Sequence, residues 1–421
     1  MAEPSPGPQA AAPAEGAGAA AASPVRRGVI ALLLGAVLAG FTAQQLLNPV
    51  LAPLSREVHL SEFQLGLVIT AAAVAFTLAS LIWGRMCDRW GHRVVLLTGL
   101  VLSALGLAAF AAVAAWALAG PRPIPAVLTA MILTRSLLFG AGIGAVPVAV
   151  LAYVSRATAG EAARTKAVSR VGAASALALV LGPGLGGALA VVTLLAPLYL
   201  APAVLAVITV AVAIAVPRPA RSGGPPAADR DAKRPGGLSP FDQRLRRYLL
   251  AGFLIFLSLG VMQIVLGFLF QDRLGLDATA AAGTVGAAGF ATGLVLVAVQ
   301  GVLVPRIGWG PVRLLRVGTP LAAVGFVVLA LGDTFWSMTA GLMVVALGLG
   351  LAMPGYTTGA TLRLRPTEQG AVAGLVNATN GATFIVGPLV GTWLYQFGPG
   401  HPIWVCAVLC VVAAASVVPR P

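Results

Sequence analysis

The sequence predicts an all-α polytopic membrane protein with twelve transmembrane helices in two pseudo-symmetric six-helix bundles. Three observations lead to this fold class. Of the 421 residues, 58% are hydrophobic and only 10% are charged, which gives a mean hydropathy of +0.94 and excludes a soluble domain of this length. Long apolar segments recur along the chain, and the second half repeats motifs of the first.

Each of the predicted helices corresponds to an apolar segment of about 20 residues, the length that crosses a bilayer. In chain order the segments are 28–52, 63–83, 94–118, 126–154, 168–192, 195–216, 248–270, 279–303, 314–332, 335–358, 371–396 and 402–418. Some neighbours are separated by only two or three residues, so those pairs are expected to be tight helical hairpins.

The basic residues predict the orientation of these helices, because cytoplasmic loops are enriched in Lys and Arg. With the N-terminus inside, the outer loops hold only Arg56, Arg122 and Arg273 of the 27 basic residues. We therefore expect a multi-pass protein of the cell membrane with both termini in the cytoplasm. This topology also accounts for the net charge of +14 without nucleic-acid binding.

The composition also predicts the domain boundaries. Residues 1–27 are rich in Ala, Pro and Gly and are expected to be a disordered cytoplasmic tail. Residues 217–247 are rich in Pro, Gly, Arg and Asp, as expected for a cytoplasmic linker. The linker separates an N-terminal bundle, 28–216, from a C-terminal bundle, 248–418, and residues 419–421 form a short cytoplasmic tail.

Two motifs recur in the two predicted bundles. GRMCDRWG, beginning at Gly84, matches GVLVPRIG at Gly301, and GPGLG at Gly182 matches GPLVG at Gly387. Duplicated halves with a substrate bound between them are typical of transporters that rock around a central site.

The charge-dense segment GRMCDRWGHR links the second and third apolar segments. Such charges are costly in hydrocarbon, so we expect a tight loop at the membrane surface. The segment resembles the signature between the second and third helices of the major facilitator superfamily of secondary transporters. The matching residues are Gly84, Asp88, Arg89, Gly91 and Arg93. Met86 and His92 depart from the family pattern.

The resemblance implies that these residues form a latch on the cytoplasmic side, which closes when the substrate site opens outward. In the latch, Asp88 and the nearby arginines would make charge pairs and contacts with helix ends. The simpler alternative is an ordinary basic cytoplasmic loop that holds two glycines.

Arg135 is the charged residue that we place deep within a span, where it needs a cavity or a partner. It begins RSLLFGAGIG, which is similar to the fourth-helix motif of drug:proton antiporters. Gly140 comes one position later than in that family, and Phe139 replaces a common Gln. The resemblance implies a role in proton coupling. The alternative is an Arg that snorkels outward or bonds to backbone carbonyls.

The fifth apolar segment resembles the antiporter signature whose core is G-P-x-x-G-G. In that family the motif is associated with export. Proline kinks a helix and glycines allow close helix contact, which suits a bending or sliding interface. Generic packing of small residues is the alternative. The residues concerned are Gly172, Gly182, Pro183, Gly186 and Gly187.

Six amide side chains within the spans are candidates for lining a substrate cavity, because a buried amide in lipid needs a partner. They are Gln44, Gln45, Asn48, Gln263, Asn377 and Asn380. Gln44 and Asn48 lie four residues apart and are expected to share a helix face. Hydrogen bonds between helices explain each of these residues equally well.

No acidic or histidine residue falls mid-membrane within the predicted spans. Many drug:proton antiporters carry an embedded carboxylate, so proton coupling here would depend on Asp88, Arg135 or an acid at the rim such as Glu62 or Asp272. A lone Arg in a cavity suits neutral or anionic solutes instead. The sequence has no HExxH, zinc-ligand or Walker A pattern, so we expect no metal, no cofactor and no enzymatic activity.

The resemblance therefore implies a secondary transporter that works as a monomer in the lipid bilayer. We expect proton-coupled efflux of small organic molecules or drugs by alternating access. The alternative is a dedicated transporter of one metabolite, such as a sugar, an amino acid or a metallophore, acting as an exporter or a uniporter.

Overall fold

The computed structural model describes residues 24–157, 161–217, 242–243, 245–362 and 368–417, and this part of the chain is helical without a strand. The first eight α-helices are α1 Pro24–Leu46, α2 Asn48–Glu57, α3 Glu62–Trp90, α4 His92–Leu118, α5 Ile124–Met131, α6 Phe139–Ala157, α7 Glu161–Ala190 and α8 Ala196–Ala215. The remaining α-helices are α9 Arg246–Leu274, α10 Ala278–Ala298, α11 Val304–Ile307, α12 Pro311–Leu331, α13 Phe335–Thr361, α14 Gln369–Tyr395 and α15 His401–Ser416. Two π-helical turns, η1 Ile132–Leu138 and η2 Val299–Leu303, continue α5 into α6 and α10 into α11.

Ten helical stretches of the described residues are long and apolar enough to cross a membrane, which makes the chain a multi-pass protein. The last two predicted spans correspond to α14 and α15. The helix α15 has only 16 residues, or about 24 Å at the usual rise, and α14 carries Asn377 and Asn380. The predicted number of twelve spans therefore stays a prediction.

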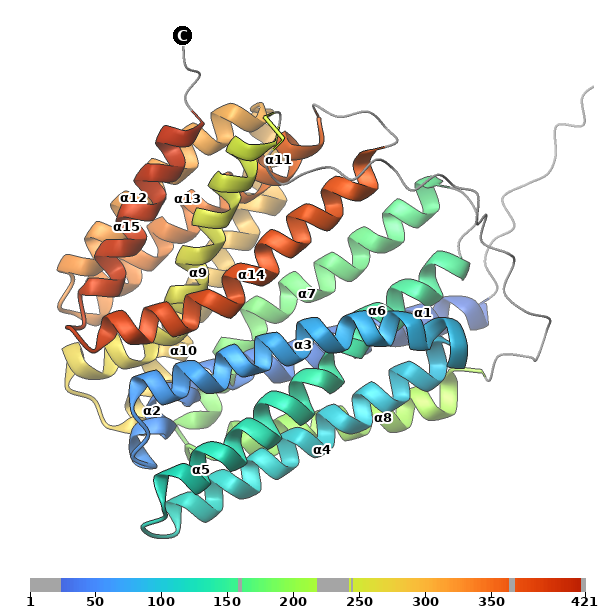
Figure 1. The fold of residues 1–421 in the computed structure, drawn as a ribbon, viewed down its shortest axis with the longest axis horizontal. Helices are drawn as coiled ribbons and strands as arrows, with labels where there is room; N and C mark the ends of the chain where they lie inside the picture. The colour runs from blue at the N-terminus through green and yellow to red at the C-terminus, as the bar shows by residue number, and fades with distance from the viewer. Residues whose placement is uncertain (1–23, 158–160, 218–241, 244, 363–367, 418–421) are drawn as a thin grey trace, which may run out of the picture.

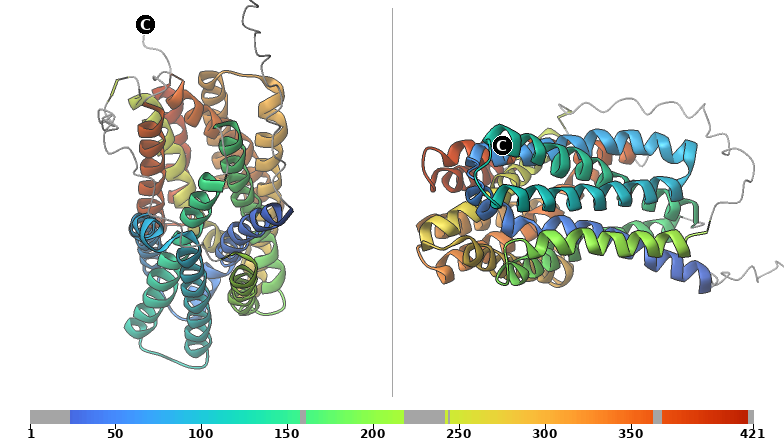
Figure 2. Two further views of the ribbon diagram at one scale, coloured as in Figure 1. Left: turned by 90° about the vertical axis from the view of Figure 1, so that its right-hand side faces the viewer. Right: turned by 90° about the horizontal axis from the view of Figure 1, so that it is seen from below.

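The helices gather into two groups, α1–α8 and α9–α15, that lie side by side (Figure 1; two further views in Figure 2). The buried apolar residues of both groups join in one cluster, which includes Phe110 and Phe139 of the first group and Phe326 and Tyr356 of the second. The groups meet where α3 packs on α14 and where α7 packs on α10.

Contacts between the groups are found at the end of the molecule where α3 begins and α14 ends. Thr70 Oγ1 in α3 donates a hydrogen bond to the carbonyl of Ile385 in α14 at 2.9 Å. A side chain added at Gly66 in α3 would collide with Thr392 in α14. We call this the closed end.

The opposite end, which carries the predicted latch motif, differs sharply. A Cβ added at Gly84 in α3, Gly172 in α7, Gly301 in η2 or Gly374 in α14 would meet no atom within 4 Å in the described part of the chain. The ribbons of α3 and α14 diverge toward this end (Figure 1). We call this the open end.

The predicted loop of the motif is almost entirely helical, so its predicted extent is wrong. The helix α3 continues through Trp90 and α4 begins at His92, which leaves Gly91 alone between them. Gly91 has φ 81°, a conformation that residues with a side chain rarely adopt. Its N–H donates to the carbonyl of Cys87 at 3.1 Å. One glycine thus makes the whole turn, and the charges of the motif lie on helix ends.

Most of the predicted tails and linker fall on residues 1–23, 218–241 and 418–421, which lie outside the described part of the chain. Within it, α1 already begins at Pro24, inside the predicted N-terminal tail, and α9 begins at Arg246, inside the predicted linker. The boundaries between the predicted bundles stay predictions.

Candidate functional site

A charged cluster joins the two helix groups at the closed end. Arg56 in α2 donates to both carboxylate oxygens of Asp272 in α9, with 2.9 Å between Nη2 and Oδ2. The same Nη2 lies 3.1 Å from Oε1 of Glu62 in α3. Tyr395 in α14 donates its hydroxyl to Asp272 Oδ2 at 2.5 Å, and the Arg56 guanidinium stacks 5.0 Å from the centre of the Phe268 ring. Separating the groups at this end would break a two-point, charge-assisted contact.

The sequence predicted Arg56 in an outer loop and Asp272 at the rim of the spans but did not pair them, because 216 residues separate the two. The duplication of the two halves did contain a signal for this pairing. The first and seventh apolar segments occupy equivalent places in the two halves, and Arg56 and Asp272 each lie just beyond the outer end of one of them.

The glycines of the GPxxGG segment in α7 face two different helices. A side chain added at Gly182 would collide with Gln45, and one at Gly186 with the carbonyl of Leu46, both in α1. A Cβ added at Gly187 would lie 2.6 Å from the Cα of Gly286 in α10, which belongs to the other group. At this segment the backbone of α7 therefore packs closely against both α1 and α10.

The remaining two residues of this predicted set differ in their surroundings. Pro183 also touches α10, since a Cβ added at Gly289 would lie 2.9 Å from the Pro183 Cβ. Gly172 lies nearer the open end, where it is exposed. The structure thus brings the GPxxGG core to the interface and leaves Gly172 away from it.

The second copy of the motif, in α14, makes the corresponding contacts. A Cβ added at Gly387 would lie 2.7 Å from Gly260, and one at Gly391 would lie 2.9 Å from the carbonyl of Val261, both in α9. A different side of α14 meets α3 through Thr392 and Gly66. The helix α14 therefore lies between α9 and α3, much as α7 lies between α1 and α10.

The charged residues of the latch motif lie at the open end. Asp88 and Arg89 are exposed on the last turn of α3. Arg93 instead reaches α8 of its own group, where Nε donates to the carbonyl of Val216 at 2.7 Å and Nη2 to that of Ala213 at 2.7 Å. A cation on the last carbonyls of a helix is a favourable cap. In this conformation Arg93 therefore stabilises one group, and the cross-group latch stays a prediction.

Arg135 is buried inside the first group, with 3% of its surface exposed. It lies in the π-helical turn η1, which packs against α3 and α4. Its Cζ lies 4.9 Å from the centre of the Phe139 ring. Its Nε has no hydrogen-bond partner in the described part of the chain, so neither outward snorkelling nor a carbonyl bond at Nε accounts for it.

Neighbouring contacts hold the π-helical turn in place. Ser136 Oγ donates to the carbonyl of Val68 in α3 at 2.6 Å. On the other side, a Cβ added at Gly106 in α4 would lie 2.9 Å from the Cα of Phe139. Single π turns inside α-helices are often found at functional sites, and this one carries the most buried charge of the described residues.

The predicted amides of the first span do not share one continuous helix. The helix α1 ends at Leu46 and α2 begins at Asn48, because Pro49 lacks the N–H that would continue the backbone ladder. Asn48 Nδ2 donates to Gln45 Oε1 at 3.2 Å. Gln44 Oε1 is buried without a hydrogen-bond partner among the described residues.

The three amides of the second group lie in α9 and α14. Gln263 is half-buried in the middle of α9. Asn377 is exposed on α14, toward the open end. Asn380 is half-buried one turn further, and its Oδ1 is buried without a partner within the described ranges. Gln44 and Asn380 are thus predicted cavity residues whose acceptor oxygen is buried without a partner among the described residues.

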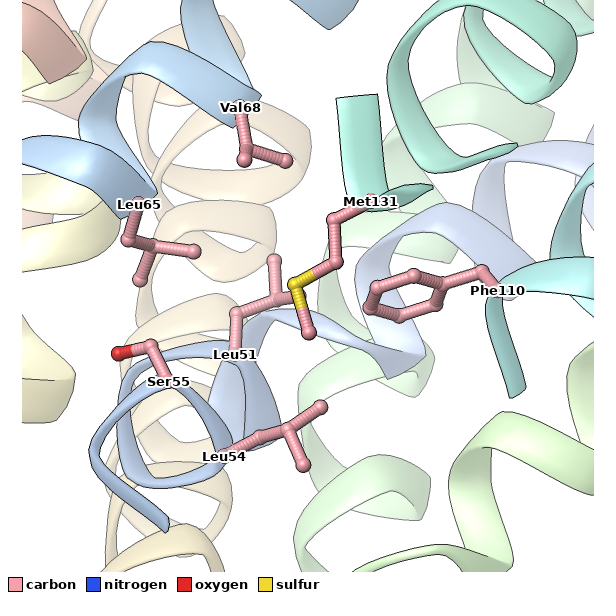
Figure 3. A pocket seen from close by; sticks show the side chains of 7 residues that line it. All are labelled: Leu51, Leu54, Ser55, Leu65, Val68, Phe110 and Met131. Carbon is pink, nitrogen blue, oxygen red and sulfur yellow. The ribbon is translucent and has the colours of Figure 1, made fainter. Parts of the chain in front are cut away.

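A small void in the first group is distinct from these residues (Figure 3). Its walls come from α2, α3, α4 and α5, and its lining residues are Leu51, Leu54, Ser55, Leu65, Val68, Phe110 and Met131. The one hydroxyl, Ser55 Oγ, already donates to the carbonyl of Ala52 at 2.7 Å. The void is therefore a gap in apolar packing and offers nothing to recognise a polar substrate.

Acidic residues of the described spans lie at helix ends. Glu57 ends its span and Glu62 begins the next, while Asp88 and Asp272 are each two residues from the end of theirs. Among the described residues, no group of three or more His, Cys, Asp and Glu side chains could hold a metal ion.

The model of the Major Facilitator Superfamily matches residues 32–382 and, in a second match, 308–421. Among curated proteins, Multidrug resistance protein 1 of Bacillus subtilis is 22% identical over 391 residues, which cover 92% of this chain and 94% of the relative. Tetracycline resistance protein, class C, of Escherichia coli is 25% identical over 379 residues, which cover 86% and 89%.

Solved transporter structures share the fold. The human organic anion transporter MFSD10 superposes with a TM-score of 0.60 at 21% identity, over 94% of this chain and 100% of that one. A bacterial homologue of the human lysosomal transporter Spinster, in an inward-facing and unoccupied conformation, superposes with a TM-score of 0.72 at 14% identity, over 94% and 96%.

Proposed function

The chain belongs to the Major Facilitator Superfamily, and on that premise we propose that it exports small organic molecules by proton-driven alternating access. Like the relatives and structural neighbours that it matches, it is a membrane transporter and not an enzyme. The positive-inside bias of its sequence favours the cell membrane with both termini in the cytoplasm. A chain with two helix groups can complete such a cycle as a monomer.

One observation carries this proposal: the two helix groups touch at one end and part at the other. The closed end has the Arg56–Asp272 pair, and the open end has the exposed Asp88. Alternating access requires two conformations that open opposite ends in turn. The positive-inside bias favours a cytoplasmic motif end, and in that orientation this conformation would receive substrate from inside the cell.

The opposite conformation would follow from rocking the groups about their α3–α14 and α7–α10 contacts. Opening the closed end breaks the contacts of Arg56 with Asp272 and separates Gly187 from Gly286. Closing the open end brings together the helix segments that carry Gly84, Gly172, Gly301 and Gly374. The absence of side chains at these glycines leaves room for the helices to approach. In that conformation Asp88 would serve as the latch.

Two findings support export of organic molecules. The matched curated relatives are named for multidrug and tetracycline resistance. The GPxxGG segment of α7, which resembles the export-associated signature, lies on the interface that must rearrange. Both point to efflux as the direction.

Proton coupling would use the acids at the ends of the spans. Asp272 is bound to Arg56 and Tyr395 while the closed end stays closed. When that end opens, the carboxylate loses these partners and becomes able to take a proton. Neutral Asp272 then attracts Arg56 less, so the proton and the conformation are linked.

The second candidate is a dedicated transporter of one metabolite, acting as an exporter or a uniporter. The observation in its favour is that the described spans carry their acids only at helix ends, which leaves no deep carboxylate for a cationic drug. Structural neighbours also include a nucleoside transporter and a bacterial homologue of an iron transporter.

The test is the intracellular accumulation of a panel of dyes, antibiotics and metabolites in efflux-deficient bacteria that express the protein, with and without a protonophore. We expect several unrelated compounds to accumulate less than in cells with an empty vector, and the protonophore to abolish the difference. If one metabolite alone responds, or if transport ignores the protonophore, the dedicated transporter replaces the efflux pump.

A further inference from the structure

Arg135 differs from Arg56, Arg93 and Arg273 in what surrounds its charge. Arg56 binds the carboxylates of Asp272 and Glu62, and Arg93 binds carbonyls at the end of α8. Arg273 binds three carbonyls at the end of α12, at 2.6–2.9 Å. Those three side chains are half-buried. Arg135 is more deeply buried than any of them, yet its guanidinium lies against the ring of Phe139.

A fixed positive charge in this place is expensive to maintain. Arg stays protonated under all ordinary conditions, and a charge in a span is retained where it faces a partner or a cavity. The acids of the described spans lie at helix ends, whereas Arg135 lies well inside the stretch Ile124–Val154. Residues of the described spans therefore leave the charge without a carboxylate.

A further unused polar group lies on α1, a helix that packs against α6 in the same span as Arg135. The helix α1 touches α6 where a Cβ added at Gly40 would lie 2.7 Å from Ile143 Cδ1. The first and fourth spans run in opposite directions, so the turn of α1 that follows Gly40 runs alongside the turn that precedes Ile143. That part of α1 carries Gln44, whose Oε1 is buried without a partner among the described residues.

We infer that Arg135 is the binding site for the anionic group of the substrate, and that the protein transports organic anions such as carboxylates. This inference rests on the proposed transport function and narrows it. A guanidinium offers a carboxylate two parallel N–H donors. An anionic substrate would therefore supply the negative partner that the positive charge of Arg135 lacks. A cationic substrate would instead meet like charge. The flexible side chain of Arg135 leaves the Phe139 ring to reach the ligand.

The experiment measures binding to the purified full-length protein by titration calorimetry. The anionic probes are benzoate, salicylate and fluorescein, each compared with a neutral amide of the same ring system, and the cationic probes are ethidium and tetraphenylphosphonium. The variants are Arg135→Gln and Arg135→Lys. Arg122→Gln is the matched control, because Arg122 also lies over an aromatic ring, that of Trp116 at 5.0 Å, but is exposed.

We expect at least one carboxylate to bind and its amide to bind at least tenfold more weakly. Arg135→Gln should weaken the carboxylate at least tenfold, Arg135→Lys should weaken it less, and Arg122→Gln should leave it unchanged. The inference is overturned if no carboxylate binds, if the carboxylate binds Arg135→Gln as well as the unmodified protein, or if the cations bind in preference.

Transport in everted membrane vesicles separates this inference from the proposed function. Gradient-driven uptake of the cations without the anions would leave efflux standing and remove the anion site. Anion binding that depends on Arg135, without gradient-driven uptake, would leave the anion site standing and remove proton-driven efflux.

Discussion

Arg56 and Asp272 form a two-point ion pair across the interface between the two helix groups, with Nη2 of one 2.9 Å from Oδ2 of the other. The pair lies at the end where α2 meets α9, and Tyr395 of α14 binds the same carboxylate. It therefore holds together the surfaces that must separate when this end opens.

The first prediction concerns this pair. Asp272→Asn should favour opening of the closed end about fivefold, because a pair that is 28% and 32% exposed contributes on the order of 1 kcal/mol. The measurement is maleimide labelling of a Thr392→Cys reporter, whose site is buried at that end, with the native cysteines replaced. The charge-reversed double variant, Arg56→Asp with Asp272→Arg, should restore slow labelling. Unchanged labelling of Asp272→Asn would show that the pair does not hold the closed end.

The second prediction concerns the crossing of α7 and α10. Gly187→Ala should destabilise the closed end by about 1–3 kcal/mol, the usual cost of overpacking, because its Cβ would lie 2.6 Å from the Cα of Gly286. Gly172→Ala, in the same helix, is the control, since no described atom lies within 4 Å of the added carbon. Melting temperature and transport should fall only for Gly187→Ala. Equal effects of the two changes would mean that the backbone contact is not what matters.

The third prediction concerns the latch. Asp88→Asn removes the charge at nearly constant shape, so it should greatly reduce transport while membrane insertion stays unchanged. Glu57→Gln, another exposed acid at a helix end, should transport normally. Uptake into vesicles and the amount of protein in the membrane are measured together. Full transport by Asp88→Asn would remove the latch role.

The sequence predicted the helical membrane fold because each span must satisfy its backbone hydrogen bonds internally and bury about 20 apolar residues in lipid. The sequence did not predict where one helix ends and the next begins. The break after Leu46 depends on Pro49, and the end of α3 at Trp90 depends on Gly91. Hydropathy averaged over a segment does not detect the effect of a single residue on the backbone.

The candidate site was predictable only in part. Arg135 was identifiable because a charge inside an apolar segment needs an explanation. Its π-helical turn was not, because that turn depends on packing against Gly106 and Val68 in other helices. The pairing of Arg56 with Asp272 joins distant parts of the chain, and a single sequence carries no direct record of such contacts.

The last prediction concerns the stability of the empty protein. Arg135→Met should raise its melting temperature, by an increase in stability of about 2 kcal/mol, because the change removes a buried charge that lacks a carboxylate and keeps an unbranched apolar side chain against Phe139. The measurement is thermal unfolding without added ligand, and Arg122→Met is the exposed control with no expected gain. If Arg135 served the fold alone, Arg135→Met would lower the stability. A clear loss of stability would therefore show that the described neighbours already compensate the charge. A gain would mean that the chain keeps Arg135 at the expense of stability, as expected for a residue whose partner is the substrate.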